Sequence, residues 1–162
     1  MCPSTWNVSA DLIRTITPLA SIGLVVLGWA LVNRQNNKRE SRKETRQLID
    51  RTLKHLAEAV DIATKYQSNS IDAMNRYVEG WKLLLALGQI SGSINTLRKK
   101  GIDPTSCAAP YINLKKCITG ADFMTSNSKP WPPDDKRWLE LLAATNSLTE
   151  TLDRLFIDSF KD

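Results

Sequence analysis

The sequence WKLLLALGQISGSINTL occupies residues 81–97 and decides the fold of the chain. Its single charge is Lys82, and its apolar residues recur at helical spacing on two faces. One face holds Trp81, Leu84, Leu85, Gly88 and Gly92, and the other holds Leu83, Leu87, Ile90, Ile94 and Leu97. A helix that is apolar on two sides is expected to be covered on both, so we predict a central helix in an all-α bundle.

This central helix is predicted over residues 71–100. It ends with three basic residues, Arg98 to Lys100, followed by Gly101, which is typical of a helix C-terminus. The uncharged run 83–97 is only 15 residues long and contains several polar side chains, so a buried helix is favoured over a second membrane segment. Gly88 and Gly92 form a G-x-x-x-G pair that permits a neighbouring helix to approach closely.

Helices are also predicted on both sides of this segment. Residues 48–67 carry an apolar stripe at alternating steps of four and three, too short for an independent coiled coil and suited to a bundle. Prolines interrupt residues 101–133, leaving room for one short helix over 111–118. A last helix is predicted to begin after Pro133 and to run to about Phe160. We therefore expect residues 48–162 to form a bundle of about three long helices plus one short one.

Residues 12–32, LIRTITPLASIGLVVLGWALV, predict a transmembrane helix. At 21 residues the segment matches the hydrocarbon thickness of a bilayer, about 30 Å. Arg14 lies in the first turn, where its side chain can reach the headgroups, and Trp6 and Trp29 lie near the two ends, as indole rings do at membrane interfaces. A cleaved signal peptide ending near Gly28-Trp29-Ala30 and a buried core helix stay open as alternatives.

The charge around this segment predicts its orientation. The tail, residues 1–11, has no Lys or Arg, whereas residues 33–47 form a basic juxtamembrane helix. Basic flanks stay in the cytoplasm, so we expect the N-terminus outside and the C-terminus inside the plasma membrane, which is the inner membrane in a bacterium. The residues expected at the headgroups include Arg34, Lys38, Arg39, Arg42 and Lys43. The chain has a formal net charge of +5, which raises the question of nucleic-acid binding. No aromatic residue lies between these charges to stack on bases, which argues against nucleic acid as a partner.

Two further features predict contacts with other chains. Thr17, Ser21 and Gly28 lie on one face of the membrane segment, where small residues would let spans associate into a homo-oligomer. Trp131, in the stiff segment Lys129 to Pro133, is a candidate to bind a protein partner, although packing against the bundle is the preferred interpretation.

No motif predicts catalysis, a cofactor site or a metal site. His55 is the only histidine, and Cys107 and Cys117 have neither metal-ligand nor redox spacing. The sequence has no phosphate-binding glycine loop and no nucleophile elbow, so we do not expect an enzyme.

Three functions fit this layout. The first is a membrane-anchored helical interaction or signalling protein that binds an unknown protein partner. The second is a membrane-perturbing effector or toxin, and the third is a spanin-like lysis protein with the opposite orientation. In architecture, though not in motifs, the chain resembles small bacterial membrane proteins that act as interaction subunits or as effectors of anti-phage defence systems.

Overall fold

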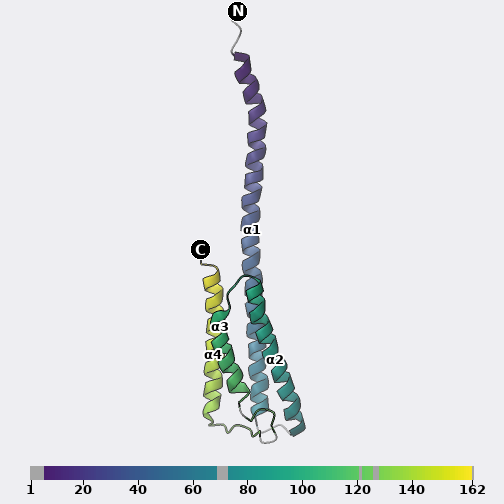
Figure 1. The fold of residues 1–162 in the computed structure, drawn as a ribbon, viewed down its shortest axis with the longest axis vertical. Coiled ribbons are helices and arrows are strands. Elements are labelled where there is room, and N and C mark those ends of the chain that lie inside the picture. Colours follow the sequence, from purple (N-terminus) through teal and green to yellow (C-terminus); the bar gives the residue numbers. More distant parts are fainter. Residues whose placement is uncertain (1–5, 69–72, 121, 126–127, 162) are drawn as a thin grey trace, which may run out of the picture. The chain divides into compact units, whose positions relative to one another are not determined.

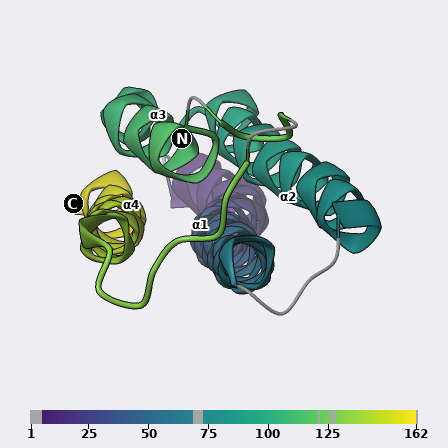
Figure 2. The same ribbon diagram turned by 90° about the horizontal axis from the view of Figure 1, so that it is seen from below.

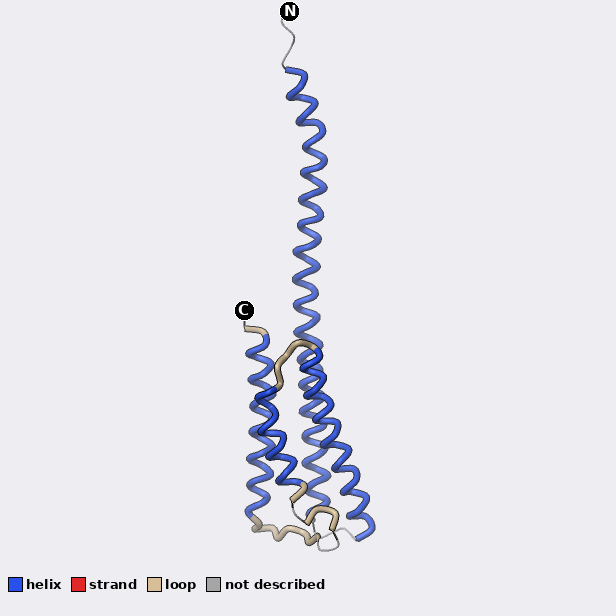
Figure 3. Tube along the Cα trace, viewed as in Figure 1, coloured by secondary structure: helices blue, strands red, loops and turns tan. Residues whose placement is uncertain are grey.

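In the residues that it describes, the computed structural model has four α-helices joined by loops (Figure 1). It describes the backbone of residues 6–68, 73–120, 122–125 and 128–161, and side chains from residue 22 onward within these ranges, apart from that of residue 73. The helices are α1 (Trp6–Gln67), α2 (Ala73–Lys99), α3 (Thr105–Ile118) and α4 (Lys136–Ser159). No strand occurs among the described residues, and the predicted all-α class is confirmed (Figure 3).

The chain divides into two units, residues 1–43 and 44–162. The first unit is the N-terminal part of α1, which is helical from Trp6 onward. None of the helices, within the described residues, combines the length and apolar character that crossing a membrane takes. Of the predicted membrane segment 12–32, residues 12–21 lie outside the residues whose side chains are described.

The second unit, residues 44–162, is an antiparallel four-helix bundle. The C-terminal part of α1, α2, α3 and α4 alternate in direction, and the end view places α2 and α4 on opposite sides of the bundle (Figures 1 and 2). Its core consists of aliphatic side chains contributed by all four helices, including Ile49, Leu56, Leu83, Ile90, Leu114, Leu148 and Leu152. We call this unit the helical body.

The helix bounds follow the predicted signals with one clear exception. α1 ends at Gln67, α2 ends at Lys99, and Gly101 adopts a φ of 80°, as a C-terminal glycine does. α3 begins at Thr105, six residues before the predicted start at Tyr111, and it contains Pro110. A proline in the second turn removes one N–H donor, and the burial of Cys107 and Leu114 holds the helix around it.

The prediction that α2 is covered on both sides is wrong. Leu83, Leu87, Ile90, Ile94 and Leu97 are buried, as expected of the core face. Trp81 and Leu85 on the other face are 55 % and 65 % exposed. In the part of the chain that the structure describes, the other helices lie along only one side of α2 (Figure 2).

Candidate functional site

The exposed face of α2 is a continuous apolar stripe about three heptads long. Positions separated by alternating steps of four and three stay on one side of a helix, and the exposed positions of α2 follow that spacing. We call this stripe the outer face. It consists of Met74, Val78, Trp81, Leu85, Gly88 and Gly92, with Tyr77 at its border. Large contiguous apolar patches on a protein surface mark sites of interaction.

The two aromatic residues of the outer face are held against each other. The rings of Tyr77 and Trp81 meet edge to face, with 6.3 Å between their centroids and an interplanar angle of 82°. This geometry is one that aromatic pairs prefer, and it restricts both side chains before any partner binds. The outer face therefore presents a partly ordered aromatic surface.

The charged residues beside the outer face are engaged within the chain. Arg76 Nη1 donates to the backbone oxygen of Ser128 at 2.9 Å, and its guanidinium lies 6.0 Å from the centroid of the Tyr66 ring. Lys82 pairs with Glu79 at 2.6 Å. These are the charged residues of 73–97, so the outer face presents few charges to a partner.

Contacts on the inner side of α2 fix its rotation. A Cβ placed on Gly80 would lie 2.8 Å from Met124 Cγ and 3.3 Å from Tyr66 Cε2, so that position is closely packed. Further along, Tyr111 Oη donates to the backbone oxygen of Leu87 at 2.9 Å. Because α2 is held at both points, the residues that point outward are determined by the fold.

A second feature is a polar cleft of about 540 Å³ at the end of the bundle where α1 and α3 finish and α4 begins. Gln67, Lys116, Cys117, Trp131 and Glu140 are among its lining residues. The Gln67 side chain is buried, and its Oε1 has no hydrogen-bond partner among the described residues. Charges of both signs line the cleft, so it has no single electrostatic preference.

The titratable groups of the body do not form an activated nucleophile among the described residues. Burial raises the pKa of Cys117, and the nearby carboxylate of Glu140 raises it further. Burial also raises the pKa of Cys107. A nucleophilic cysteine needs the opposite shift. His55 Nδ1 lies 3.3 Å from Glu58 Oε2, and no three His, Cys, Asp or Glu side chains in the described residues are grouped to hold a metal ion.

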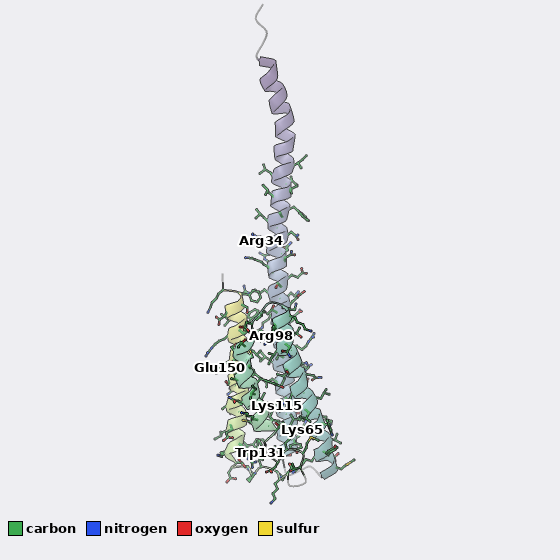
Figure 4. The ribbon with its side chains drawn as sticks, viewed as in Figure 1. Arg34, Lys65, Arg98, Lys115, Trp131 and Glu150 are labelled. Atoms are coloured by element: carbon green, nitrogen blue, oxygen red, sulfur yellow. The ribbon has the colours of Figure 1, made fainter. Side chains whose placement is uncertain are left out.

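Trp131, the candidate for partner binding, lies inside the bundle. Its side chain is 6 % exposed and contacts the Trp138 ring with 4.9 Å between centroids. The guanidinium of Arg137 lies 4.8 Å from the centroid of the Trp131 ring, and the backbone N–H of Trp131 donates to the Gln67 backbone oxygen at 3.0 Å. Figure 4 shows Trp131 at the end of the bundle where α4 begins. Trp131 therefore packs against the bundle and presents little surface to solvent.

The residues predicted at the membrane are described only in part. Trp29 is exposed, as are the basic residues of 33–43, and a Cβ added to Gly28 would meet nothing within 4 Å. The same holds for Gly88 and Gly92. The side chains of Trp6, Arg14, Thr17 and Ser21 lie outside the described residues.

Most residues of the outer face are recognisable in the sequence as one apolar face, which was predicted to be buried. Met74, Tyr77 and Val78 were not predicted to belong to that face, although their spacing from Trp81 and Leu85 places them on the same stripe. Periodicity identifies an apolar face, yet it does not say whether that face is covered by the same chain or by another.

Comparison with protein-family models, with curated proteins and with solved structures finds no match.

Proposed function

We propose that the chain is a single-pass membrane-anchored helical interaction protein without enzymatic activity of its own. In this proposal residues 12–32 span the bilayer, the basic residues of 33–47 lie at the cytoplasmic headgroups, and the helical body binds a protein partner. The observation that carries the proposal is the outer face of α2, an exposed apolar stripe on a helix that is well packed on its other side.

The support for the anchor comes from the first unit. Residues 22–32 are without exception apolar or glycine, and every one of them is exposed. Exposed aliphatic side chains in an unbroken run are unfavourable in water, at roughly 25 cal/mol per Å² of apolar surface, and are favourable in hydrocarbon. The cluster of Lys and Arg that follows is attracted to anionic lipid by about 1 kcal/mol per well-placed residue.

The support for partner binding is the composition of the outer face. Trp, Tyr and Met are enriched where proteins bind each other, and charged residues are depleted at the centre of such interfaces. The outer face has this composition, and Gly88 and Gly92 add a shallow surface that another helix can approach. A helix of a partner protein is therefore the expected ligand.

The anchor is tested with the full chain and with a variant that lacks residues 1–33. Reporters that work on only one side of the membrane are fused after Asp162, and cell fractions are washed with alkaline carbonate. We expect the full chain to stay in the membrane fraction with a cytoplasmic reporter signal, and the shortened chain to leave that fraction. A periplasmic reporter, or a full chain released by carbonate, would disprove the anchor as proposed.

Partner binding is tested by placing a photo-crosslinking amino acid at position 81 in living cells. The matched control is position 139, because Leu139 on α4 is also a large exposed residue, at 71 % exposure. We expect a discrete cross-linked product from position 81 and none from position 139. Equal products from both positions, or none from position 81, would contradict the role of the outer face.

A further inference from the structure

We propose that the occupant of the outer face is the α2 helix of a second copy of this chain, packed antiparallel. The inference rests on the proposed function, because it names the partner of the same face. Four observations support it: the distribution of side-chain size along the outer face, the open glycines, the position of the charges, and the available area.

The outer face is self-complementary when two copies run in opposite directions. Its N-terminal half carries the large residues, which are Met74, Val78, Trp81 and Leu85, and its C-terminal half carries Gly88 and Gly92. In an antiparallel pair, the register that sets Trp81 against Gly92 of the second copy also sets Leu85 against its Gly88. A twofold axis repeats both contacts, so Trp81 and Leu85 of each copy lie over the two glycines of the other. In the same register Val78 and Met74 lie opposite Asn95 and Lys99 of the other copy.

A parallel pair lacks this fit. It would place Trp81 against Trp81 and Gly92 against Gly92, leaving a bulge at one end and a gap at the other. It would also bring the basic C-terminal turns of both helices together, each with Arg98 and Lys99. Antiparallel packing keeps these two C-terminal turns at opposite ends of the helix pair. It also sets the two helix dipoles antiparallel, which is electrostatically favourable.

Among the described residues, no contact requires glycine at position 88 or 92. A glycine inside a helix costs about 1 kcal/mol relative to alanine. At Gly80 the close approach of Met124 and Tyr66 explains the missing side chain. At Gly88 and Gly92 an added Cβ would meet nothing within 4 Å. Close packing of a second helix at these two positions would explain why both residues are glycine.

Charge and area are both compatible with a stable pair. Arg76, Glu79 and Lys82 are already engaged within their own chain, so association leaves no charge of residues 73–97 without a partner. The large residues of the outer face are 41–75 % exposed, so complete coverage of them would bury at most about 600 Å² per copy, or about 1,200 Å² for two copies. This is near the lower limit of specific, stable protein interfaces.

The test uses the full chain in detergent micelles. Two preparations, one of them isotopically labelled and differently tagged, are mixed, and each carries a photo-crosslinking amino acid at position 81. We expect an adduct that contains both tags and that mass spectrometry maps to residues near Gly92 of the other copy. An adduct that maps to residues 78–85 would indicate parallel packing and would overturn the proposal.

Substitution separates this contact from association through the membrane segment. Gly92→Leu should raise the dissociation constant of the dimer at least tenfold, whereas Gly28→Leu and the exposed control Leu139→Ala should leave it within twofold of the unsubstituted chain. Loss of the dimer in Gly28→Leu with no effect of Gly92→Leu would overturn the proposal. Circular dichroism of each variant checks that the helices remain folded.

The same probe in cells distinguishes failure of this inference from failure of the proposed function. An adduct between position 81 and a different protein would overturn the second-copy proposal and leave the proposed function intact. The absence of any adduct in cells and in micelles would overturn both.

Discussion

The hydroxyl of Tyr66 accepts a hydrogen bond from the backbone N–H of Met124 at 2.8 Å, although 58 positions separate the two residues in the sequence. The same hydroxyl lies 3.2 Å from Ser128 Oγ, and the Tyr66 ring packs on Phe123 with 5.1 Å between centroids. Met124 has a φ of 56°, a conformation that is uncommon for a bulky side chain. Tyr66 therefore connects the end of α1 to the loop that precedes α4.

Tyr66→Phe removes that hydroxyl and leaves the half-buried Met124 N–H without its acceptor. The free energy of unfolding should fall by about 0.5–1.5 kcal/mol, which is the net contribution of a typical intramolecular hydrogen bond. Urea denaturation of the full chain in mild detergent, followed by circular dichroism, measures the change. Tyr77→Phe is the matched control because Tyr77 is exposed on α2, and equal effects of the two substitutions would contradict the role of Tyr66.

Gly101 ends α2 in a left-handed conformation, with a φ of 80°. The Ile102 N–H donates to the Leu97 oxygen at 3.1 Å across this turn. Gly101→Ala should lower the free energy of unfolding by about 1 kcal/mol, because a Cβ is disfavoured in that conformation. Gly101→Asn should cost less, since asparagine tolerates it better. Thermal denaturation compares the two, and an alanine variant as stable as the unsubstituted chain would contradict this account.

The sequence predicts the helices much better than it predicts their surroundings. The end of α2 was predictable because Arg98, Lys99 and Gly101 are local signals that act within one turn. The start of α3 was missed because Pro110 is read locally as a breaker, whereas burial of Cys107 and Leu114 by distant helices stabilises the turn around it. Whether the second apolar face of α2 is covered depends on how many helices surround it, which periodicity does not encode.

The Asp135 carboxylate caps α4 and is bound by Arg137. It accepts from the Arg137 backbone N–H at 2.9 Å and from Arg137 Nε at 3.0 Å. The side-chain bond from Arg137, together with the backbone bond, lowers the pKa of Asp135 from 3.8 to about 2. A carboxyl whose pKa is lower in the folded state stabilises the fold above its ordinary pKa, and that contribution is lost as the pH falls toward 2.

Asp135→Asn should therefore reduce the loss of unfolding free energy that accompanies a fall in pH below 4. The amide can still cap the helix, but it does not titrate. Between pH 4 and pH 2, the unsubstituted chain should lose more stability than the variant in urea titrations at each pH. Asp134→Asn, at the adjacent exposed position, should retain the unsubstituted profile. If Asp135→Asn and the unsubstituted chain lose stability in parallel, Asp135 has no such role.

The two cysteines of the body should differ in reactivity. Cys107 is fully buried and Cys117 is half-buried, and the pKa of each thiol is raised. In a Cys2→Ser background at pH 7.5, Cys117 should react with a maleimide more slowly than a free thiol, and Cys107 should react only on unfolding. Mass spectrometry of the peptides after timed labelling measures both rates. Fast labelling of Cys107 in the folded chain would contradict its burial.

Leu83 and Leu85 lie two positions apart on α2, and truncation of the two side chains should have very different effects on stability. Leu83 is 0 % exposed, so Leu83→Ala leaves a cavity and should lower the free energy of unfolding by about 2–5 kcal/mol. Leu85 lies on the outer face, so Leu85→Ala should change the stability of the isolated chain by less than about 0.5 kcal/mol. Denaturation at low protein concentration compares the two.

Protein concentration then separates folding from association. If the outer face is buried by a partner copy, the stability of the unsubstituted chain should rise with concentration, because binding to the folded state stabilises it. Leu85→Ala should weaken that rise, whereas the exposed control Leu139→Ala should keep it. A large loss from Leu85→Ala at low concentration would mean that the outer face is covered within the single chain, contrary to the structure.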